Sequence, residues 1–395
     1  MVRTFLAAAA ALCAALTVGA CGSGSEATGD AAPTAAKPAP SFAAVQEAAR
    51  GQTVRWWMFG GDDRINAYVD EVVTPAAAKA GITVKRVPIT DTADAVQRVV
   101  AERRAGKDSG GGVDLIWLNG ENFAAGKRAG LWLEDWAMKL PNARYLDAED
   151  PTITTDFQVP VDGQEAPWSR AAFVFAADSA KLPRPPADLD ALLAYAKAHP
   201  GRVSYPAPPD FTGSAFVRQV LAAKGPDAGF AYLKTLAPFL YRKGATYPKS
   251  EAELSDLFGN GQLDIAMSYD AAFVRAAVRK GTFPKTTRPF LLGRSSLQNV
   301  SFLTIPANAA NRAGAQVLAD LLLSPALQAA KADPDVLGIP TVLDTAKLPP
   351  ADRARFGAPA DGPYVLSDLG KPLSEVAADD VAPLEARWKR EVLAG

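Results

Sequence analysis

The pattern of apolar and polar residues along the chain predicts strands and helices in alternation. Three short, mostly apolar runs have the length of buried strands: residues 53–59, 82–87 and 113–117. Between them, apolar residues recur at helical spacing over residues 65–73 and 96–100. A strand–helix–strand–helix–strand order predicts a parallel sheet that is covered by helices, so the fold class is α/β.

Polar residues follow the third strand directly. The strand ends at Asn119-Gly120, a turn pair, and Glu121, Asn122 and Phe123 then lead into a helical run. In open α/β sheets, ligands bind at the carboxyl ends of such strands. Gly60-Gly61-Asp62 and Ser268-Tyr269-Asp270 repeat this layout after two other strands. These loops together are expected to line one site.

A second set of elements follows. We expect helices at 189–198, around 216–221, around 254–258 and at 381–393, and strands at 202–205 and 263–267. Residues 160–177 and 298–305 are long extended runs, and we interpret them as crossings between two lobes. Trp132 and Trp136 lie four apart in residues 131–140, which predicts a helix with a buried stripe rather than a ligand platform.

Composition narrows the function. The 395 residues suffice for two domains, and 42 basic against 43 acidic residues leave no basic field for nucleic acid. The single histidine, His199, is expected at a helix end, so we expect neither a histidine-rich metal site nor a Ser-His-Asp mechanism. The sequence contains no glycine-rich phosphate-binding motif. We therefore expect no cofactor, no metal and no enzymatic activity.

The N-terminus has the pattern of a secretory signal. Arg3 precedes an apolar run over residues 5–18, which is short for a membrane span. The run ends Leu-Thr-Val-Gly-Ala-Cys at Cys21 and resembles the lipobox of bacterial lipoproteins, in which the cysteine carries acyl chains. We expect a signal peptide at 1–20, a lipid-anchored flexible tether at 21–50 and a location outside the cytoplasm, on the bacterial cell membrane. The alternative is an ordinary signal peptide in which Cys21 is incidental.

Several motifs together resemble a known family. Residues 318–328 (LADLLLSPALQ) are similar to a helix pair of the family 1 extracellular solute-binding proteins of ABC importers. A closer resemblance is to the thiamine-type ABC transporter binding proteins, at Gly60-Gly61-Asp62, 113–124, 166–168, 208–211, 263–266 and 340–343. The resemblance implies a two-lobed, type II periplasmic-binding-protein-like fold with a ligand cleft between the lobes. It also implies a monomer that works with a permease and an ATPase. We expect lobe 1 to comprise 51–165 plus 290–335, and lobe 2 to comprise 166–289 plus 336–395.

A binding protein of this kind needs groups from both lobes and performs no reaction. The candidate ligand-binding residues are Trp57, Phe59, Asp62, Asn119, Glu121, Asn122, Trp168, Asp210, Phe211, Ser268, Tyr269, Asp270 and Asn299. This set is rich in aromatic rings, carboxylates and amides, which suits a thiamine-like or other cationic heteroaromatic or amine ligand. A carbohydrate is the alternative, because rings and hydrogen-bonding groups also fit sugars. Asp270 stands where the resembled pattern has an asparagine, so the identity of the ligand does not transfer.

Two other classes of function remain open at this point. A secreted glycosidase would use paired carboxylates such as Glu121 and Asp270, about 5–10 Å apart across a cleft. A surface adhesion or assembly lipoprotein that had adopted the fold would have its cleft filled by side chains.

Overall fold

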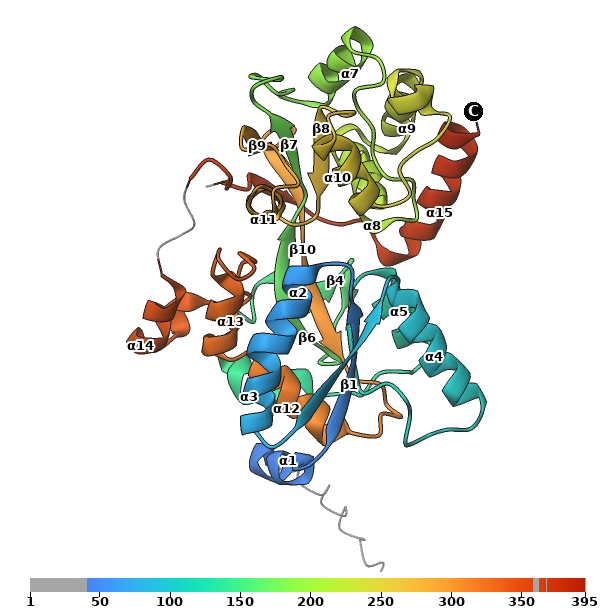
Figure 1. The fold of residues 1–395 in the computed structure, drawn as a ribbon. Helices are drawn as coiled ribbons and strands as arrows, with labels where there is room; N and C mark the ends of the chain where they lie inside the picture. Colours follow the sequence, from blue (N-terminus) through green and yellow to red (C-terminus); the bar gives the residue numbers. More distant parts are fainter. Residues whose placement is uncertain (1–40, 358–361, 367, 395) are drawn as a thin grey trace, which may run out of the picture. The chain divides into compact units, whose positions relative to one another are not determined.

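The computed structural model describes residues 41–357, 362–366 and 368–394 (Figure 1). The expected signal peptide and Cys21, the expected lipidation site, lie outside these residues. In the part of the chain that the structure describes, no helix is both long and apolar enough to cross a membrane.

The larger sheet contains the predicted parallel strands. Its strands are β1 (Thr53–Phe59), β2 (Thr83–Ile89), β3 (Leu115–Leu118), β6 (Glu165–Ala172), β10 (Ser295–Thr304) and β11 (Lys371–Leu373). The order is β11-β10-β3-β1-β2, and β6 also pairs with β10. Strands β1, β2 and β3 are parallel, as predicted, whereas β10 is antiparallel to β3 and to β6. The carboxyl ends of the three parallel strands therefore meet at one edge of the sheet.

Helices link and cover these strands. The helical elements of this lobe are α1 (Phe42–Ala49), α2 (Asp63–Ala67), a π-helical turn (Tyr68–Val73), α3 (Thr74–Lys79), α4 (Thr92–Arg104), α5 (Glu121–Arg128), α6 (Pro151–Thr154), α12 (Arg312–Leu322), α13 (Pro325–Ala332) and α14 (Pro350–Arg353). Asp62 and Asp91 cap α2 and α4 with their side chains, which satisfies amide groups at each helix start. Trp56, Tyr68 and Leu318 lie in the core between sheet and helices.

The second lobe has its own sheet and core. Strands β7 (Val174–Asp178), β8 (Ile265–Ser268) and β9 (Thr287–Phe290) form an antiparallel sheet in the order β8-β7-β9. Its helices are α7 (Leu189–Ala198), α8 (Phe211–Lys224), α9 (Pro226–Leu236), α10 (Glu251–Gly259) and α11 (Phe273–Lys280). Phe175, Phe216 and Leu254 are among the residues of this second core.

Two segments pass from one sheet to the other, as the extended runs predicted. The chain leaves β6 and enters β7 across Phe173, whose amide donates to the carbonyl of Leu297 at 2.9 Å. Strand β10 has Leu297 in the second core and Phe302 in the first. The two lobes are therefore joined by paired strands rather than by a loose linker.

The C-terminal helix α15 (Ala378–Trp388) contacts both lobes. Leu384 and Trp388 lie in the second core, and a π-helical turn (Lys389–Leu393) continues the helix. At its start, Ala378 and Val381 pack on Phe157 and Ala124 of the first lobe. Figure 1 shows α15 beginning beside α5 and running up along the second lobe.

Three local predictions were wrong. Residues 42–49, which we placed in the tether, form α1, where Ala49 is fully buried and Phe42 packs on the first core. Residues 131–140 form no long helix, because Trp132 bridges to Pro306 as a strand would and Asp135 takes a positive φ of 53°. Residues 202–205 form no strand: the carbonyls of Arg202 and Val203 accept from the amides of Asp264, in a loop, and Tyr241, at the start of a 3-10 helix, and not from a neighbouring strand.

We predict that Trp388→Ala lowers the free energy of unfolding by about 3–5 kcal/mol. The indole is 1% exposed, packs on Tyr205 and Tyr247, and donates to the Tyr205 hydroxyl at 2.9 Å. Urea unfolding measures the change. Leu393→Ala is the matched control near the same chain end, because Leu393 is 40% exposed and its truncation should cost less than about 0.5 kcal/mol. Equal losses in the two variants would contradict the assigned packing.

Candidate functional site

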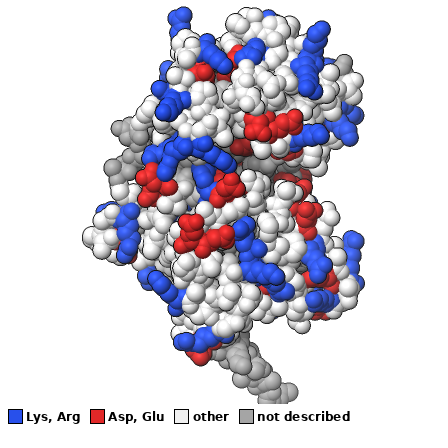
Figure 2. Space-filling view, viewed as in Figure 1, with Lys and Arg blue, Asp and Glu red and all other residues white. Residues whose placement is uncertain are grey.

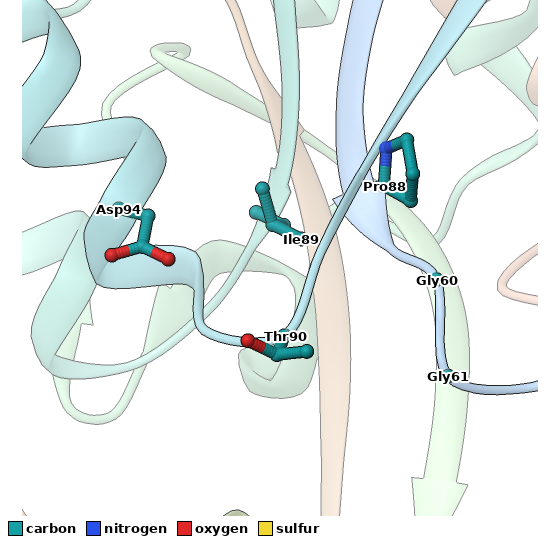
Figure 3. A pocket seen from close by; sticks show the side chains of 6 residues that line it. All are labelled: Gly60, Gly61, Pro88, Ile89, Thr90 and Asp94. Atoms are coloured by element: carbon teal, nitrogen blue, oxygen red, sulfur yellow. The ribbon is translucent and has the colours of Figure 1, made fainter.

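The loops after β1 and β2 form a small cavity at the carboxyl edge of the larger sheet. It has a volume of about 320 Å³ and is lined by Gly60, Gly61, Pro88, Ile89, Thr90 and Asp94 (Figure 3). A side chain at Gly60 would place its Cβ 2.4 Å from Cβ of Pro88, so only glycine fits there. Asp94 is the one charged residue in this lining.

An ion-pair network joins the two lobes beside this cavity. One guanidinium nitrogen of Arg64, Nη2, lies 2.7 Å from a carboxylate oxygen of Asp62 and 2.7 Å from one of Asp270. Burial alone would lower the pKa of Arg64. The carboxylates of Asp270 and Asp62 outweigh burial and raise that pKa above its usual value, so the guanidinium stays charged. The structure thus brings together two predicted site residues, Asp62 and Asp270, through an arginine that the sequence reasoning did not select.

Glu121 begins helix α5 directly after the turn at Asn119-Gly120. Gly120 has a φ of 67°, and its amide donates to Asp156 at 2.6 Å, which fixes the turn. Burial raises the pKa of the half-buried Glu121 carboxyl, and Glu385 and Glu375 act in the same direction. Asn119 and Asn122 are also half-buried.

Arg218, in the middle of α8, is 1% exposed. Its Nε donates to Glu375 Oε2 at 2.7 Å, its Nη2 to Oε1 at 3.3 Å and its Nη1 to the Ser214 hydroxyl at 2.7 Å. The rings of Phe157 and Phe211 lie 5.4 and 5.5 Å from its guanidinium carbon. Burial works to lower the pKa of Arg218, but Glu375 outweighs it and raises that pKa above its usual value.

Four carboxyl groups interact electrostatically with Arg218 or with one another. We call this group the interlobe cluster: Glu121, Asp156, Arg218, Glu375 and Glu385. Glu121 and Asp156 come from the first lobe, and Glu385 accepts a hydrogen bond from Ser214 on α8 at 2.6 Å. Figure 2 shows acidic side chains on both sides of the hollow at mid-height on the right of the view. The cluster has one cation, and that cation is already paired.

Asp156 of the hairpin β4 (Thr155–Asp156)–β5 (Val159–Pro160) forms a buried pair with Glu165. Burial raises the pKa of both carboxyl groups well above the usual range; Asp156 raises that of Glu165 further, and Glu121 and Glu375 raise that of Asp156. Neither carboxylate oxygen of Glu165 has a hydrogen-bond partner among the described residues. This pair is therefore protonated far more readily than exposed carboxylates are.

Two predicted site residues present exposed aromatic faces. Phe59, at the end of β1, and Phe211, at the start of α8, are each 42% exposed and belong to different lobes. The Phe211 ring packs on Tyr269, with ring centroids 5.3 Å apart. Tyr269 itself is buried, and its hydroxyl donates to Glu375 Oε1 at 2.8 Å. Exposed rings of this kind suit stacking on a ligand.

Three other predicted site residues have side chains that are largely covered by the protein. Trp168 is 1% exposed and lies edge-on to Trp56 and Trp117 in the first core, so the structure does not bring it to the surface. Trp57 is half-buried against a small cluster beside β3. The side-chain amide atoms of Asn299, on the crossing strand β10, are buried and have no hydrogen-bond partner in the described part of the chain.

Asp210 and Ser268 support the second-lobe side of the site. Asp210 caps α8 through the amide of Gly213 at 3.0 Å, and burial raises its pKa. The Ser268 hydroxyl accepts from the amide of Asp270 at 3.0 Å. Glu251 lies between them; burial raises its pKa to about 7, while hydrogen bonds from Thr212 and Ser268 oppose the rise.

The sequence reasoning missed Arg218 and Glu375. One signal was available: Arg218 stands inside the apolar run 215–221, so a buried helix there would have to pair its charge. Its partner was not identifiable, because Glu375 is 157 residues away in the chain.

Comparison with known proteins identifies the class. Residues 71–355 match the model of the family described as bacterial extracellular solute-binding protein. The chain belongs to this family, and it is the solute-binding component of an ABC transporter, located outside the cytoplasm. Such proteins bind small solutes and work with permease and ATPase partners; they are not enzymes. A relative, Protein YnjB of Escherichia coli (strain K12), is 41% identical over 362 residues, which cover 87% of this chain and 92% of that protein.

Solved structures share the fold. The periplasmic binding protein AfuA of Actinobacillus pleuropneumoniae, with exogenous fructose-6-phosphate bound, matches with a TM-score of 0.63 at 12% identity, over 87% of this chain and 100% of AfuA. The apo ferric ion-binding protein A of Pasteurella haemolytica matches with a TM-score of 0.62 at 16% identity, over 87% and 98%. The substrate binding protein of an ABC transporter from Agrobacterium tumefaciens matches with a TM-score of 0.61 at 16% identity, over 86% and 94%. The predicted two-lobed type II fold is thereby confirmed.

We predict that Glu251 makes the free energy of unfolding fall between pH 5 and pH 8. Its pKa is about 7 in the folded protein and near 4.5 when unfolded, so the folded state holds the proton more tightly and loses that advantage as the pH rises. In Glu251→Gln this part of the pH dependence should vanish, as measured by urea unfolding at several pH values. Glu253→Gln, an exposed site on the same helix, should keep the wild-type slope. Equal slopes in all three proteins would disprove the assignment.

Proposed function

We propose that this protein is a substrate-binding lipoprotein of an ABC importer that captures a cationic small solute between its lobes. The ligand class is an amine or a heteroaromatic cation, of which thiamine is one example. The observation that supports this choice is the composition of the interlobe cluster, in which four carboxyl groups accompany a single guanidinium that is already paired with Glu375. A cation entering there meets Glu121 and Glu385, which have no ion-pair partner among the described residues of the cluster.

The exposed aromatic rings support the same ligand class. Phe59 and Phe211 would contact the solute from opposite lobes, and ring faces attract cations within about 6 Å. Glu121 would supply the countercharge, and Asn119, Asn122 and Asn299 would supply hydrogen bonds. Asp62 and Asp270 would act indirectly, because both are engaged by Arg64.

A carbohydrate is the second candidate. The buried Asn299 amide has a donor and an acceptor without partners among the described residues, and a sugar hydroxyl satisfies either. Aromatic faces such as Phe211 also stack on sugar rings.

The domain limits and the assembly state belong to the same proposal. We propose a monomer with lobe 1 at 51–165 plus 290–335 and lobe 2 at 166–289 plus 336–395, except that strand β6, which pairs in the larger sheet, and helix α14 belong with lobe 1. The packing of Leu337, Val342 and Leu348 in the first core favours moving residues 336–348 to lobe 1. The tether would end before α1, and Cys21 would carry the lipid anchor.

We predict that a cationic solute raises the melting temperature of the mature protein. Ligand binding to the folded state adds RT ln(1 + [L]/Kd) to its stability. A thermal-shift panel should contain thiamine, its phosphates, putrescine, spermidine and neutral sugars, all at matched ionic strength. A shift with amines or thiamine supports the proposal, a shift with sugars alone supports the second candidate, and no shift with any solute contradicts both.

We predict that Glu121→Gln weakens binding of that cation about 10- to 100-fold. A hydrogen bond to a charged group contributes roughly 1.5–3 kcal/mol, and Gln retains the shape while it removes the charge. Isothermal titration calorimetry measures the change. Glu253→Gln, remote from the cluster, is the control. Unchanged affinity in Glu121→Gln would assign Glu121 to the support of the turn instead.

We predict that Cys21→Ser abolishes acylation of the protein. A serine offers no thiol for acylation, whereas the apolar signal run remains intact. Fractionation with immunodetection, together with labelling by a radioactive fatty acid, measures the outcome. Cys13→Ser is the matched control and should remain acylated. Acylation of the Cys21→Ser protein would disprove the anchor.

A further inference from the structure

Glu375 occupies a site that is built to hold an oxyanion. Its two carboxylate oxygens accept from Nε and Nη2 of Arg218 at 2.7 and 3.3 Å, and from the Tyr269 hydroxyl at 2.8 Å. A guanidinium fork with an added hydroxyl donor is the arrangement that binds carboxylates and phosphates in proteins. Here both partners of the pair belong to the same chain, and Glu375 is 6% exposed.

The carboxylate reaches this position from a distant segment. Glu375 lies between β11 and α15, and its carbonyl accepts from Gln158 Nε2 of the first-lobe hairpin at 2.9 Å. Three residues later, the amide of Ala378 donates to the carbonyl of Phe157 at 3.0 Å. These backbone contacts hold Glu375 on Arg218, so it competes with free anions as a tethered, intramolecular partner.

We propose that Glu375 is a specificity-determining residue that fills the Arg218–Tyr269 oxyanion site and thereby excludes anionic solutes, such as those bearing phosphate. This inference rests on the proposed function of the interlobe site and defines the solutes that the site rejects. Rejection has two sources. The guanidinium is already paired with Glu375, and the carboxylates of Glu121 and Glu385 repel an incoming anion.

Removal of the Glu375 side chain reverses both effects. In Glu375→Ala, Arg218 remains buried with its charge unpaired, and an unpaired buried charge is strongly unfavourable. An anion from solution restores the pairing and fits the vacated volume. Glu375→Gln removes the charge but retains the volume, so it should bind an anion less well than Glu375→Ala does.

The test is a phosphate titration of wild type, Glu375→Ala, Glu375→Gln and Glu385→Gln, followed by thermal shift and calorimetry against sodium chloride of equal ionic strength. Glu385→Gln removes one negative charge from the same cluster but leaves Glu375 on Arg218. We expect Glu375→Ala to bind phosphate at least tenfold more tightly than wild type and Glu385→Gln. Circular dichroism of each variant establishes that it is folded.

Two results overturn the inference. One is a folded Glu375→Ala protein that responds to phosphate no more than Glu385→Gln does. The other is a wild-type protein that binds phosphate or fructose 6-phosphate and loses that binding in Arg218→Gln. If Glu375→Ala is unfolded, refolding on addition of phosphate supports the inference and failure to refold opposes it. The cation panel on wild type separates the two claims. If wild type binds no cation but Glu375→Ala binds phosphate, the proposed function is wrong and the inference about Glu375 stands.

Discussion

The paired strands that cross between the two sheets are the constraint on which the rest of the structure depends. Strand β10 contributes Leu297 to one core and Phe302 to the other, and the chain runs from β6 to β7 through the buried Phe173. Backbone hydrogen bonds within a ladder are obligatory for buried groups, so these strands cannot separate without loss of both sheets. The polar loops at the strand ends are thereby held across from one another, and side-chain ion pairs and the backbone hydrogen bond from Ala378 to Phe157 connect the lobes.

Two arginines bridge that space, and their ion pairs differ in free energy because they are buried to different degrees. Arg64 and Asp270 are 27% and 24% exposed in their side chains, and ion pairs of that kind contribute about 0–1 kcal/mol. Arg218 and Glu375 are 1% and 4% exposed, so each charge loses its hydration, and only the full set of donors from Arg218, Tyr269 and Ser214 offsets that cost. Breaking the partly exposed Arg64–Asp270 pair therefore costs less than breaking the buried one. The buried pair is part of the folded core.

Elements whose pattern is local were predictable from the sequence. The strand at 53–59 and the helix at 189–198 appear with the expected limits, because alternation and helical spacing are properties of neighbouring residues. The helix predicted at 131–140 does not form, and the reason is a tertiary contact. The Leu133 amide donates to Ile305 at 2.7 Å and Trp132 bridges to Pro306, so an available strand edge outweighed a helical spacing of two tryptophans.

The same distinction explains the candidate site. Loop residues that follow a strand were predictable as a class, and Asp62, Glu121 and Asp270 do lie where the lobes meet. Their roles were not predictable, because the role of each side chain depends on which residue it contacts in the fold. Asp270 adds a charge to a loop, yet Arg64 neutralises it, whereas Glu121 stays without an ion-pair partner in the described chain. The net charge where the lobes meet therefore depends on which carboxylates the two arginines engage, and those contacts join residues 157 and 206 positions apart in the chain.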